Sequence, residues 1–276
     1  MSESLTEHRS VLELSPAERE ERGIEADTVR DALVAVVSRG DRDEKTFEGR
    51  TFPELELDYL DVGGENNHPV VFRDCTFEEG ISVEHADVML PLTFVDCEVG
   101  GMEIEDAHFE YDVAVTDSTI TAPVHAEEAR FDRDCTFEGT TFTAETRLEE
   151  ITCRQDASFV GTRFEGRTSF RGGDFAGKSN EMDDNADFTD ATFVETVDFG
   201  RVDLGACDFT RATFEGTAEF EDALLDGDAW FRRATFADEA HFSEVTFAED
   251  ATFESARFEA PANFRGTEFR GGARTL

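Results

Sequence analysis

The spacing of the phenylalanines constrains the fold of this sequence more than any other feature. The chain has 27 Phe beside two Tyr and one Trp. Toward the C-terminus, Phe or Leu recurs every five or six residues, at Phe188, Phe193, Phe199, Leu204, Phe209, Phe214, Phe220, Leu225, Phe231, Phe236, Phe242, Phe247, Phe253, Phe258, Phe264 and Phe269. Five residues advance an α-helix by about 500°, so these side chains would scatter around a helix. The spacing therefore excludes a helical repeat.

A second periodic position supports a β-structure. A small residue stands two places before most of the large ones, as in Ala-Thr-Phe at 191–193, 212–214, 234–236 and 251–253. Small, polar and large residues in that order match the inward, outward, inward alternation of a short strand. Turn pairs such as Glu138-Gly139 and Glu215-Gly216 follow the large residue. The pattern predicts strands of about three residues separated by turns.

Four such units form one coil of a solenoid. Four steps of alternating five and six residues make 22, and this is the distance from Phe137 to Phe159 and from Phe231 to Phe253. The pattern extends backward to Phe72 with more substitutions, which predicts nine to ten coils and a rod about 40 Å long. We expect an inward ladder that includes Phe137, Phe159, Phe188, Phe209, Phe231 and Phe253. Because each buried Phe contributes roughly 1.5–3 kcal/mol, the ladder can stabilise a fold despite the low apolar content.

The Ala-Thr-Phe-x-x units, and Ala-Asp-Phe at 186–188, resemble the pentapeptide-repeat family with its A(D/N)-L/F-x-x motif. The resemblance covers about 200 residues, in a Phe-rich, haloarchaeal-type variant that adds a sixth residue to about every second unit. It implies an all-β solenoid, a right-handed quadrilateral parallel β-helix. We assign residues 1–45 to a helical N-terminal cap, 46–270 to the β-helix and 271–276 to a C-terminal tail.

The N-terminal segment has the signals of two helices. Ser15 can cap a helix that starts at Pro16, with Glu18 completing a capping box. A second helix is predicted from about Asp27 to Ser38, where apolar residues form a stripe. This stripe covers the first coil in the simplest interpretation, and docks a partner helix in the alternative.

Two stretches interrupt the rhythm and predict loops. One is 61–69, and the other is 176–187, where the step between large residues rises to 13. Protruding loops often carry binding residues, so Met182, Asp183 and Asp184 are possible partner contacts. A second possible contact is the outward Trp230 with Arg232 and Arg233. The alternatives are a tolerated insertion and ordinary surface packing.

The C-terminal end of the repeat offers a different contact. No capping element follows the last large residue, Phe269. An uncovered coil exposes strand edges. We therefore expect a homodimer through the C-terminal coil.

Charge limits the possible partners. Lys and Arg number 25 against 65 Asp and Glu, which gives a net charge of -40 spread along the whole chain. This field repels nucleic-acid phosphates, so no direct nucleic-acid binding is expected. The composition fits a salt-rich cytoplasm. The sequence has no stretch long and apolar enough for a membrane span, and the first residues do not resemble a signal peptide, so we expect a cytoplasmic protein.

The chemistry-bearing residues predict no catalytic site. The five Cys occupy inward positions and are interpreted as core; Cys75 and Cys97 stack one coil apart, where a disulfide is conceivable but not expected in a reducing cytoplasm. The six His share no metal-ligand spacing, and Asp183, Asp184 and Asp187 lack the pattern of a calcium loop. We expect no metal, no cofactor and no enzyme activity.

Two functions remain open. The first is a non-enzymatic scaffold that binds another protein, of unknown identity. The second follows from the resemblance, since some family members imitate duplex DNA and occupy the DNA-binding groove of a topoisomerase, gyrase. Acidic residues on a rod fit both interpretations.

Overall fold

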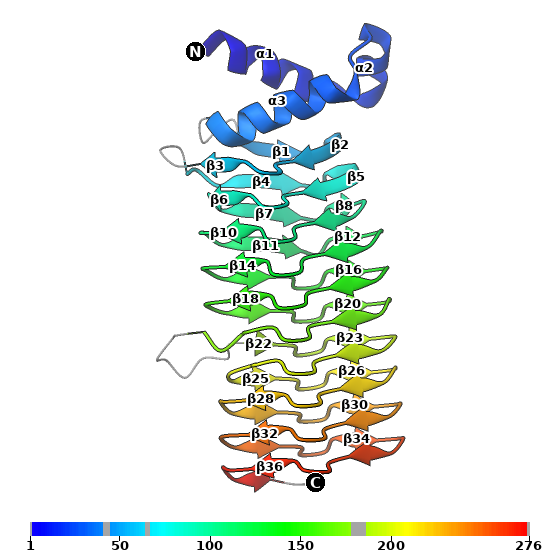
Figure 1. Ribbon diagram of the computed structural model, residues 1–276. Helices are drawn as coiled ribbons and strands as arrows, with labels where there is room; N and C mark the ends of the chain where they lie inside the picture. Colours follow the sequence, from blue (N-terminus) through cyan, green and yellow to red (C-terminus); the bar gives the residue numbers. More distant parts are fainter. Residues whose placement is uncertain (1, 41–44, 64–66, 178–185, 275–276) are drawn as a thin grey trace.

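The computed structural model describes residues 2–40, 45–63, 67–177 and 186–274. The molecule is a rod of stacked coils, about ten turns of parallel β-solenoid, with three helices at its N-terminal end (Figure 1). The predicted all-β solenoid with a helical N-terminal cap is therefore confirmed. The helices are α1 (Ser2–Leu12), α2 (Pro16–Arg22) and α3 (Ala26–Arg39).

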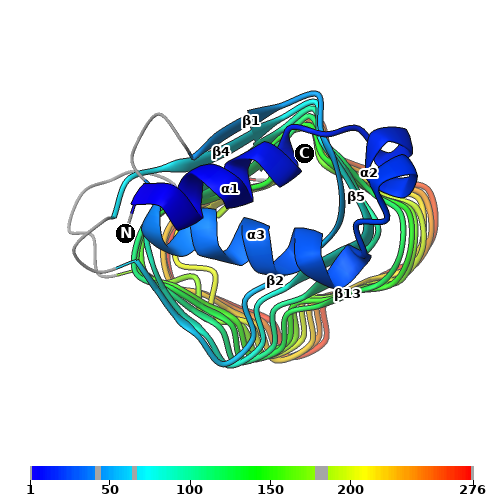
Figure 2. The same cartoon turned by 90° about the horizontal axis from the view of Figure 1, so that it is seen from above.

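The helices form as the capping signals predict. The Ser15 side chain accepts a hydrogen bond from the Glu18 amide, and the Glu18 carboxylate accepts one from the Ser15 amide at 2.9 Å. Gly23 ends α2 in the left-handed region, with φ of 65°. Helix α1 was not predicted, and α1 and α3 lie side by side across the end of the solenoid (Figure 2).

Helix α3 covers the first coil with its apolar stripe. Val29, Ala32, Leu33, Val36 and Val37 are all buried, and α3 packs on β2 (Thr51–Glu56). The stripe therefore covers the first coil instead of facing outward to a partner helix. This contact closes the N-terminal end of the core.

Each coil contributes strands to four faces. Face 1 is one 11-stranded sheet: β1 (Thr46–Glu48), β4 (Val70–Arg73), β7 (Leu92–Val95), β11 (Val113–Thr116), β15 (Cys135–Thr136), β19 (Ala157–Ser158), β22 (Ala186–Asp187), β25 (Cys207–Asp208), β29 (Ala229–Trp230), β33 (Ala251–Thr252) and β37 (Ala273–Arg274). Its last strand, β37, lies in the segment that the sequence analysis assigned to a C-terminal tail.

Faces 2 and 3 together form an 18-stranded sheet. Strands β2 and β5 (Thr76–Ser82) run through both faces. Face 2 continues with β8 (Glu98–Val99), β12 (Thr119–Ile120), β16 (Thr141–Phe142), β20 (Arg163–Phe164), β23 (Thr192–Phe193), β26 (Thr213–Phe214), β30 (Thr235–Phe236) and β34 (Arg257–Phe258). Face 3 continues with β9 (Met102–Glu103), β13 (Val124–His125), β17 (Thr146–Arg147), β21 (Thr168–Ser169), β24 (Val197–Asp198), β27 (Ala218–Glu219), β31 (Ala240–His241) and β35 (Ala262–Asn263).

Face 4 consists of two shorter sheets. Its strands are β3 (Asp61–Gly63), β6 (Asp87–Met89), β10 (His108–Phe109), β14 (Arg130–Phe131), β18 (Thr152–Cys153), β28 (Leu224–Leu225), β32 (Thr246–Phe247) and β36 (Glu268–Phe269). Single bridges through Asp174 and Asp203 connect the two sheets. Strand β3 corrects the prediction of a loop from residue 61, because Val62 pairs beside Val88 and is buried.

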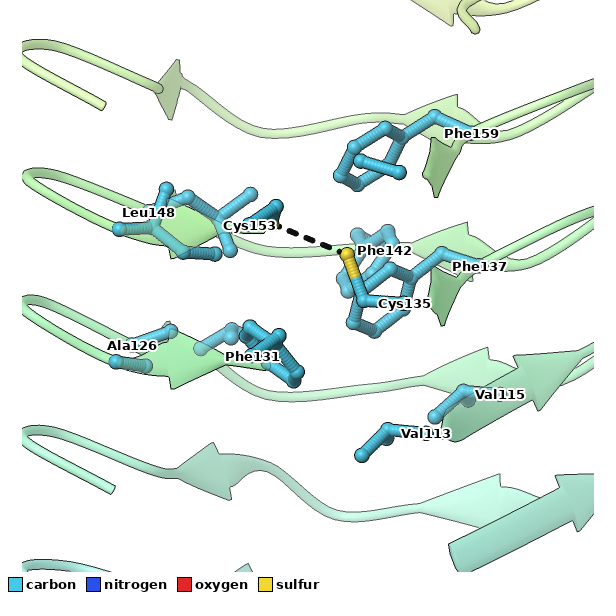
Figure 3. Packing of buried hydrophobic residues seen from close by; sticks show 14 of the residues in the cluster. Val113, Val115, Ala126, Phe131, Cys135, Phe137, Phe142, Leu148, Cys153 and Phe159 are labelled. Atoms are coloured by element: carbon cyan, nitrogen blue, oxygen red, sulfur yellow. Dashed lines mark hydrogen bonds between the residues drawn. The ribbon is translucent and has the colours of Figure 1, made fainter. Parts of the chain in front are cut away.

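The large inward side chains form stacked ladders. The Phe209 ring lies 4.8 Å from Phe188 and 4.9 Å from Phe231, with the planes almost parallel. Phe199 and Phe220 meet the same ring edge-to-face. Figure 3 shows how such rings from successive coils fill the interior. All of the proposed ladder residues are buried: Phe137, Phe159, Phe188, Phe209, Phe231 and Phe253.

The coils turn through left-handed residues at two corners. One corner includes Asp74, Asp96 and Asp117, with φ of 50°, 54° and 50°. Aspartate tolerates this conformation better than most residues because its short side chain can hydrogen-bond locally. These corners align the same repeat position in successive coils, so outward side chains form columns.

Candidate functional site

The proposed contact at Trp230 lies on face 1. Trp230 is half-buried on β29, between Asp208 and Thr252 of the neighbouring coils. The Arg232 guanidinium carbon lies 5.8 Å from the centre of the Trp230 ring, within cation–π range, and Arg232 is exposed. Arg233 is exposed at the next corner with φ of 58°. Trp230 and Arg232 therefore form one patch, the Trp230 patch, that presents an aromatic ring beside a cation.

The other proposed contact falls outside the described residues. Met182, Asp183 and Asp184 belong to the segment 178–185, which the structure does not describe. The coils on either side are continuous, because Phe175 and Phe188 are both buried. The loop contact therefore stays a prediction.

A histidine bridge on face 4 was missed by sequence reasoning. His108 Nδ1 lies 2.9 Å from Asp87 on one side, and Nε2 lies 3.0 Å from Asp132 on the other. Burial lowers the pKa of His108, but the hydrogen bonds with Asp132 and Asp87 outweigh it, so the pKa is raised. The sequence analysis considered the six histidines only as metal ligands.

A carboxylate column runs along face 3. The backbone ladder aligns Glu84, Glu105, Glu127 and Glu149 in successive coils, and Glu103 lies beside them. Burial raises the pKa of Glu103; His125 opposes the shift, and the neighbouring glutamates add to it. The column concentrates negative charge, which Arg147 partly offsets through its contact with Glu127 at 3.7 Å.

Two pairs of thiols lie in the core. Cys135 Sγ is 3.2 Å from Cys153 Sγ, across the interior of one coil (Figure 3). Burial is the main reason that the pKa of Cys153 is raised, and hydrogen bonding to Cys135 adds to it. Cys75 and Cys97 stack on adjacent coils of face 2, as predicted, and all five cysteines, including Cys207, are buried.

A surface depression lies at the helical end. It has a volume of about 690 Å³ and lies between α3 and the first coil, lined by residues such as His8, Arg30, Val34 and Leu60. The Arg30 guanidinium is already paired with carboxylates of the protein there, those of Asp27, Glu54 and Glu79. Within the described ranges, no group of three His, Cys, Asp or Glu is arranged to hold a metal ion. No helix among the same residues is long and apolar enough to cross a membrane.

The repeat agrees with a known family pattern. A family model of pentapeptide repeats, nine copies long, matches residues 181–224, 204–246 and 231–275. Residues 181–275 therefore consist of pentapeptide repeats. The matched part is the most regular third of the chain, and the structure continues the same coil back to β1. No curated protein matches the sequence.

The pentapeptide unit explains where side chains point. In Ala212-Thr213-Phe214, the Ala and Phe are fully buried and the Thr is half-exposed. The first and third positions therefore determine the core. The second position and the corners carry the charge and any recognition.

Proposed function

We propose that this pentapeptide-repeat protein is a non-enzymatic scaffold that binds another protein in a salt-adapted cytoplasm. The observation that carries the proposal is the filled interior, in which large and small inward positions pack continuously from Phe52 to Phe253. Substrates bind in concave, mostly apolar pockets. Where the inward positions are all used in packing, the rod presents only its outer columns to other molecules.

The Trp230 patch is the contact that we propose for this partner. Trp and Arg are the residues most enriched among those that dominate binding energy at interfaces. Trp230 lies on β29 of face 1, and Arg232 lies in the turn that follows, within cation–π range of the Trp230 ring. An acidic or aromatic group on the partner can pair with Arg232, while the same contact buries the Trp230 ring.

A retention experiment with matched variants tests this function. The immobilised chain is incubated with its native cytosol at high KCl, and bound proteins are identified. We expect Trp230→Ala to lose a protein that wild type and Thr213→Ala both retain, since Thr213 is a half-exposed strand position on face 2. If wild type retains no protein beyond an unfolded sample, the binding function is wrong. If retention is unaffected by Trp230→Ala, only the patch is wrong.

A DNA-mimicking role is the second candidate, and the carboxylate column on face 3 favours it. Successive glutamates stand about 4.8 Å apart along the rod, whereas the charges of one DNA strand are about 3.4 Å apart along the helix axis, so the column forms a comparable but less dense row of negative charge. Such a surface competes with DNA for the groove of a topoisomerase. A supercoiling assay in high salt is the test: we expect inhibition at micromolar protein, and its absence rejects this candidate.

We also propose a homodimer through the last coil. Phe264 and Phe269 are 38% and 41% exposed there, whereas the equivalent Phe242 and Phe247 are buried. Strands β34, β35, β36 and β37 each pair with a described strand on one side only. Light scattering of this chain in high salt is expected to give the dimer mass, and a monomer mass at high concentration overturns the proposal.

A further inference from the structure

The two thiol pairs have different environments. Cys135 and Cys153 lie inside one coil, remote from the surface and lined by rings (Figure 3). Cys75 and Cys97 instead lie at the floor of a groove of about 460 Å³, in which the corner residues Asp74, Asp96 and Asp117 form one wall. Only the second pair therefore borders solvent.

Backbone pairing holds the groove thiols against each other. Thr76 and Glu98 are partners in the parallel ladder, and the Cys75 carbonyl accepts the Glu98 amide at 2.9 Å. The preceding residues, Cys75 and Cys97, therefore stack, and their thiols donate to the carbonyls of Arg73 and Val95 at 3.2 and 3.4 Å. Neighbouring strands are about 4.8 Å apart, close to the Cα separation of many disulfides. Little backbone movement is needed to join them.

The two thiols also differ from each other. Hydrogen bonding from Cys97 is the main reason that the pKa of the Cys75 thiol falls to about 7, against the opposing effects of burial and of Asp74. The pKa of Cys97 is raised by its contact with Cys75 and by burial. Cys75 is therefore the better thiolate of the pair, and Cys97 is the remaining thiol.

The groove selects the oxidant by charge and size. Cys75 and Cys97 are only 1% and 3% exposed, so a large reagent cannot reach them without opening the coil. Asp74, Asp96 and Asp117 repel anions such as glutathione disulfide, and they have no such effect on a small neutral molecule. Hydrogen peroxide meets both requirements.

We propose that Cys75 and Cys97 form a peroxide-reactive dithiol that closes to a disulfide between the first coils of the rod. The Cys75 thiolate attacks one peroxide oxygen, the O–O bond breaks, and the departing hydroxide takes a proton to become water. Cys75 is then a sulfenic acid. The Cys97 sulfur attacks it, the S–O bond breaks, and a second water leaves with the Cys97 proton. The pair loses two electrons and one peroxide gains them.

The test is oxidation of the folded full-length chain with limiting hydrogen peroxide at high KCl. The sample is quenched, unfolded, alkylated and digested with a protease that cuts at acidic residues, because the nearest basic cleavage sites, Arg73 and Arg130, flank both cysteines. We expect peptides linked through Cys75 and Cys97, while Cys207, at 0% exposure, remains alkylated. Oxidation of Cys207 at the same rate as Cys75 overturns the proposal, as does a Cys135–Cys153 link formed first.

Serine variants separate the two steps. Ser118 fills the next inward position of the same column, so Cys75→Ser and Cys97→Ser place there a residue that the coil already accommodates. We expect Cys97→Ser to accumulate a sulfenic acid at Cys75, trapped by dimedone, and Cys75→Ser to lower thiol loss at least tenfold. The control Cys207→Ser is expected to react like wild type. Equal oxidation rates with hydrogen peroxide and glutathione disulfide contradict the charge argument.

Discussion

The Phe ladder makes a quantitative prediction about position along the rod. Phe209 is fully buried and stacks between Phe188 and Phe231 at 4.8 and 4.9 Å. Substitution Phe209→Ala removes a buried ring, leaves a cavity and breaks two stacked contacts. Large-to-small changes of this kind cost about 3–5 kcal/mol. At the last coil, Phe269 is 41% exposed and stacks only on Phe247, so we expect Phe269→Ala to cost about 1 kcal/mol.

The assay is urea unfolding at constant high KCl, because urea leaves the ionic strength unchanged. Far-ultraviolet circular dichroism follows the whole rod, and the fluorescence of Trp230 follows the coil adjacent to Phe209. If the circular dichroism and fluorescence transitions coincide, unfolding is two-state and a free energy of unfolding can be calculated from them. The control is Phe209→Leu, which we expect to cost less than about 1.5 kcal/mol because Leu204 and Leu225 already fill large inward positions. The ladder argument is wrong if Phe209→Ala destabilises no more than Phe269→Ala.

Three further predictions concern charge and the cap. When KCl is lowered from about 3 M to about 0.05 M, we expect circular dichroism to show a loss of β-structure, because the repulsion within a net charge of -40 is no longer screened. An unchanged spectrum contradicts salt adaptation. Because the pKa of His108 is raised, its bridge stabilises the fold fully below the ordinary histidine pKa of about 6.5, and this stabilisation disappears as the pH rises through the raised pKa. The difference in urea midpoint between wild type and His108→Gln should therefore shrink as the pH rises. A difference that stays constant with pH contradicts this prediction. Arg19 is buried and donates to the Thr51 carbonyl at 2.7 Å, so Arg19→Met should cost about 1–3 kcal/mol, against less than about 0.5 for the exposed Arg22→Met, both measured by urea unfolding.

The architecture was predictable because every coil obeys the same local rule. The 22-residue step that places Phe209 and Phe231 in one ladder is visible in the sequence, and the structure pairs their neighbours Asp208 and Trp230 in the predicted register. The same residue pattern recurs in many units, so it remains recognisable when one unit is irregular. Helix α3 was predictable for a different reason, its apolar stripe.

Features that depend on one long-range contact were not predictable in this way. Helix α1 has few apolar residues, and its position depends on packing against α3, with Leu12 buried. Strand β3 forms because Val62 pairs with Val88, and the local sequence around Val62 does not predict this pairing. The same holds for the groove at Cys75, since its depth depends on corner conformations.

The His108 bridge lies between these cases. Asp87 and His108 are 21 residues apart, close to one coil, so placing the sequence on a 22-residue coil aligns them on face 4. Asp132 lies 24 residues beyond His108 and reaches it from the next outward position. Aligning the sequence by coil therefore predicts side-chain contacts between outward residues of neighbouring coils, which considering each residue on its own does not.

The same columns explain why the charge of this protein matters to its fold. Stacking places equivalent side chains about 4.8 Å apart, where two unit charges interact by about 1 kcal/mol in water. Some columns relieve this by alternating sign, as where Arg211 donates to Asp190 of the preceding coil at 2.6 Å. The corner of Asp74, Asp96 and Asp117 has like charges in three successive coils, and the described residues supply no ion pair for them. Repulsion there depends on dissolved ions for screening, so ionic strength acts on the stacking of particular coils and not only on the net charge of -40.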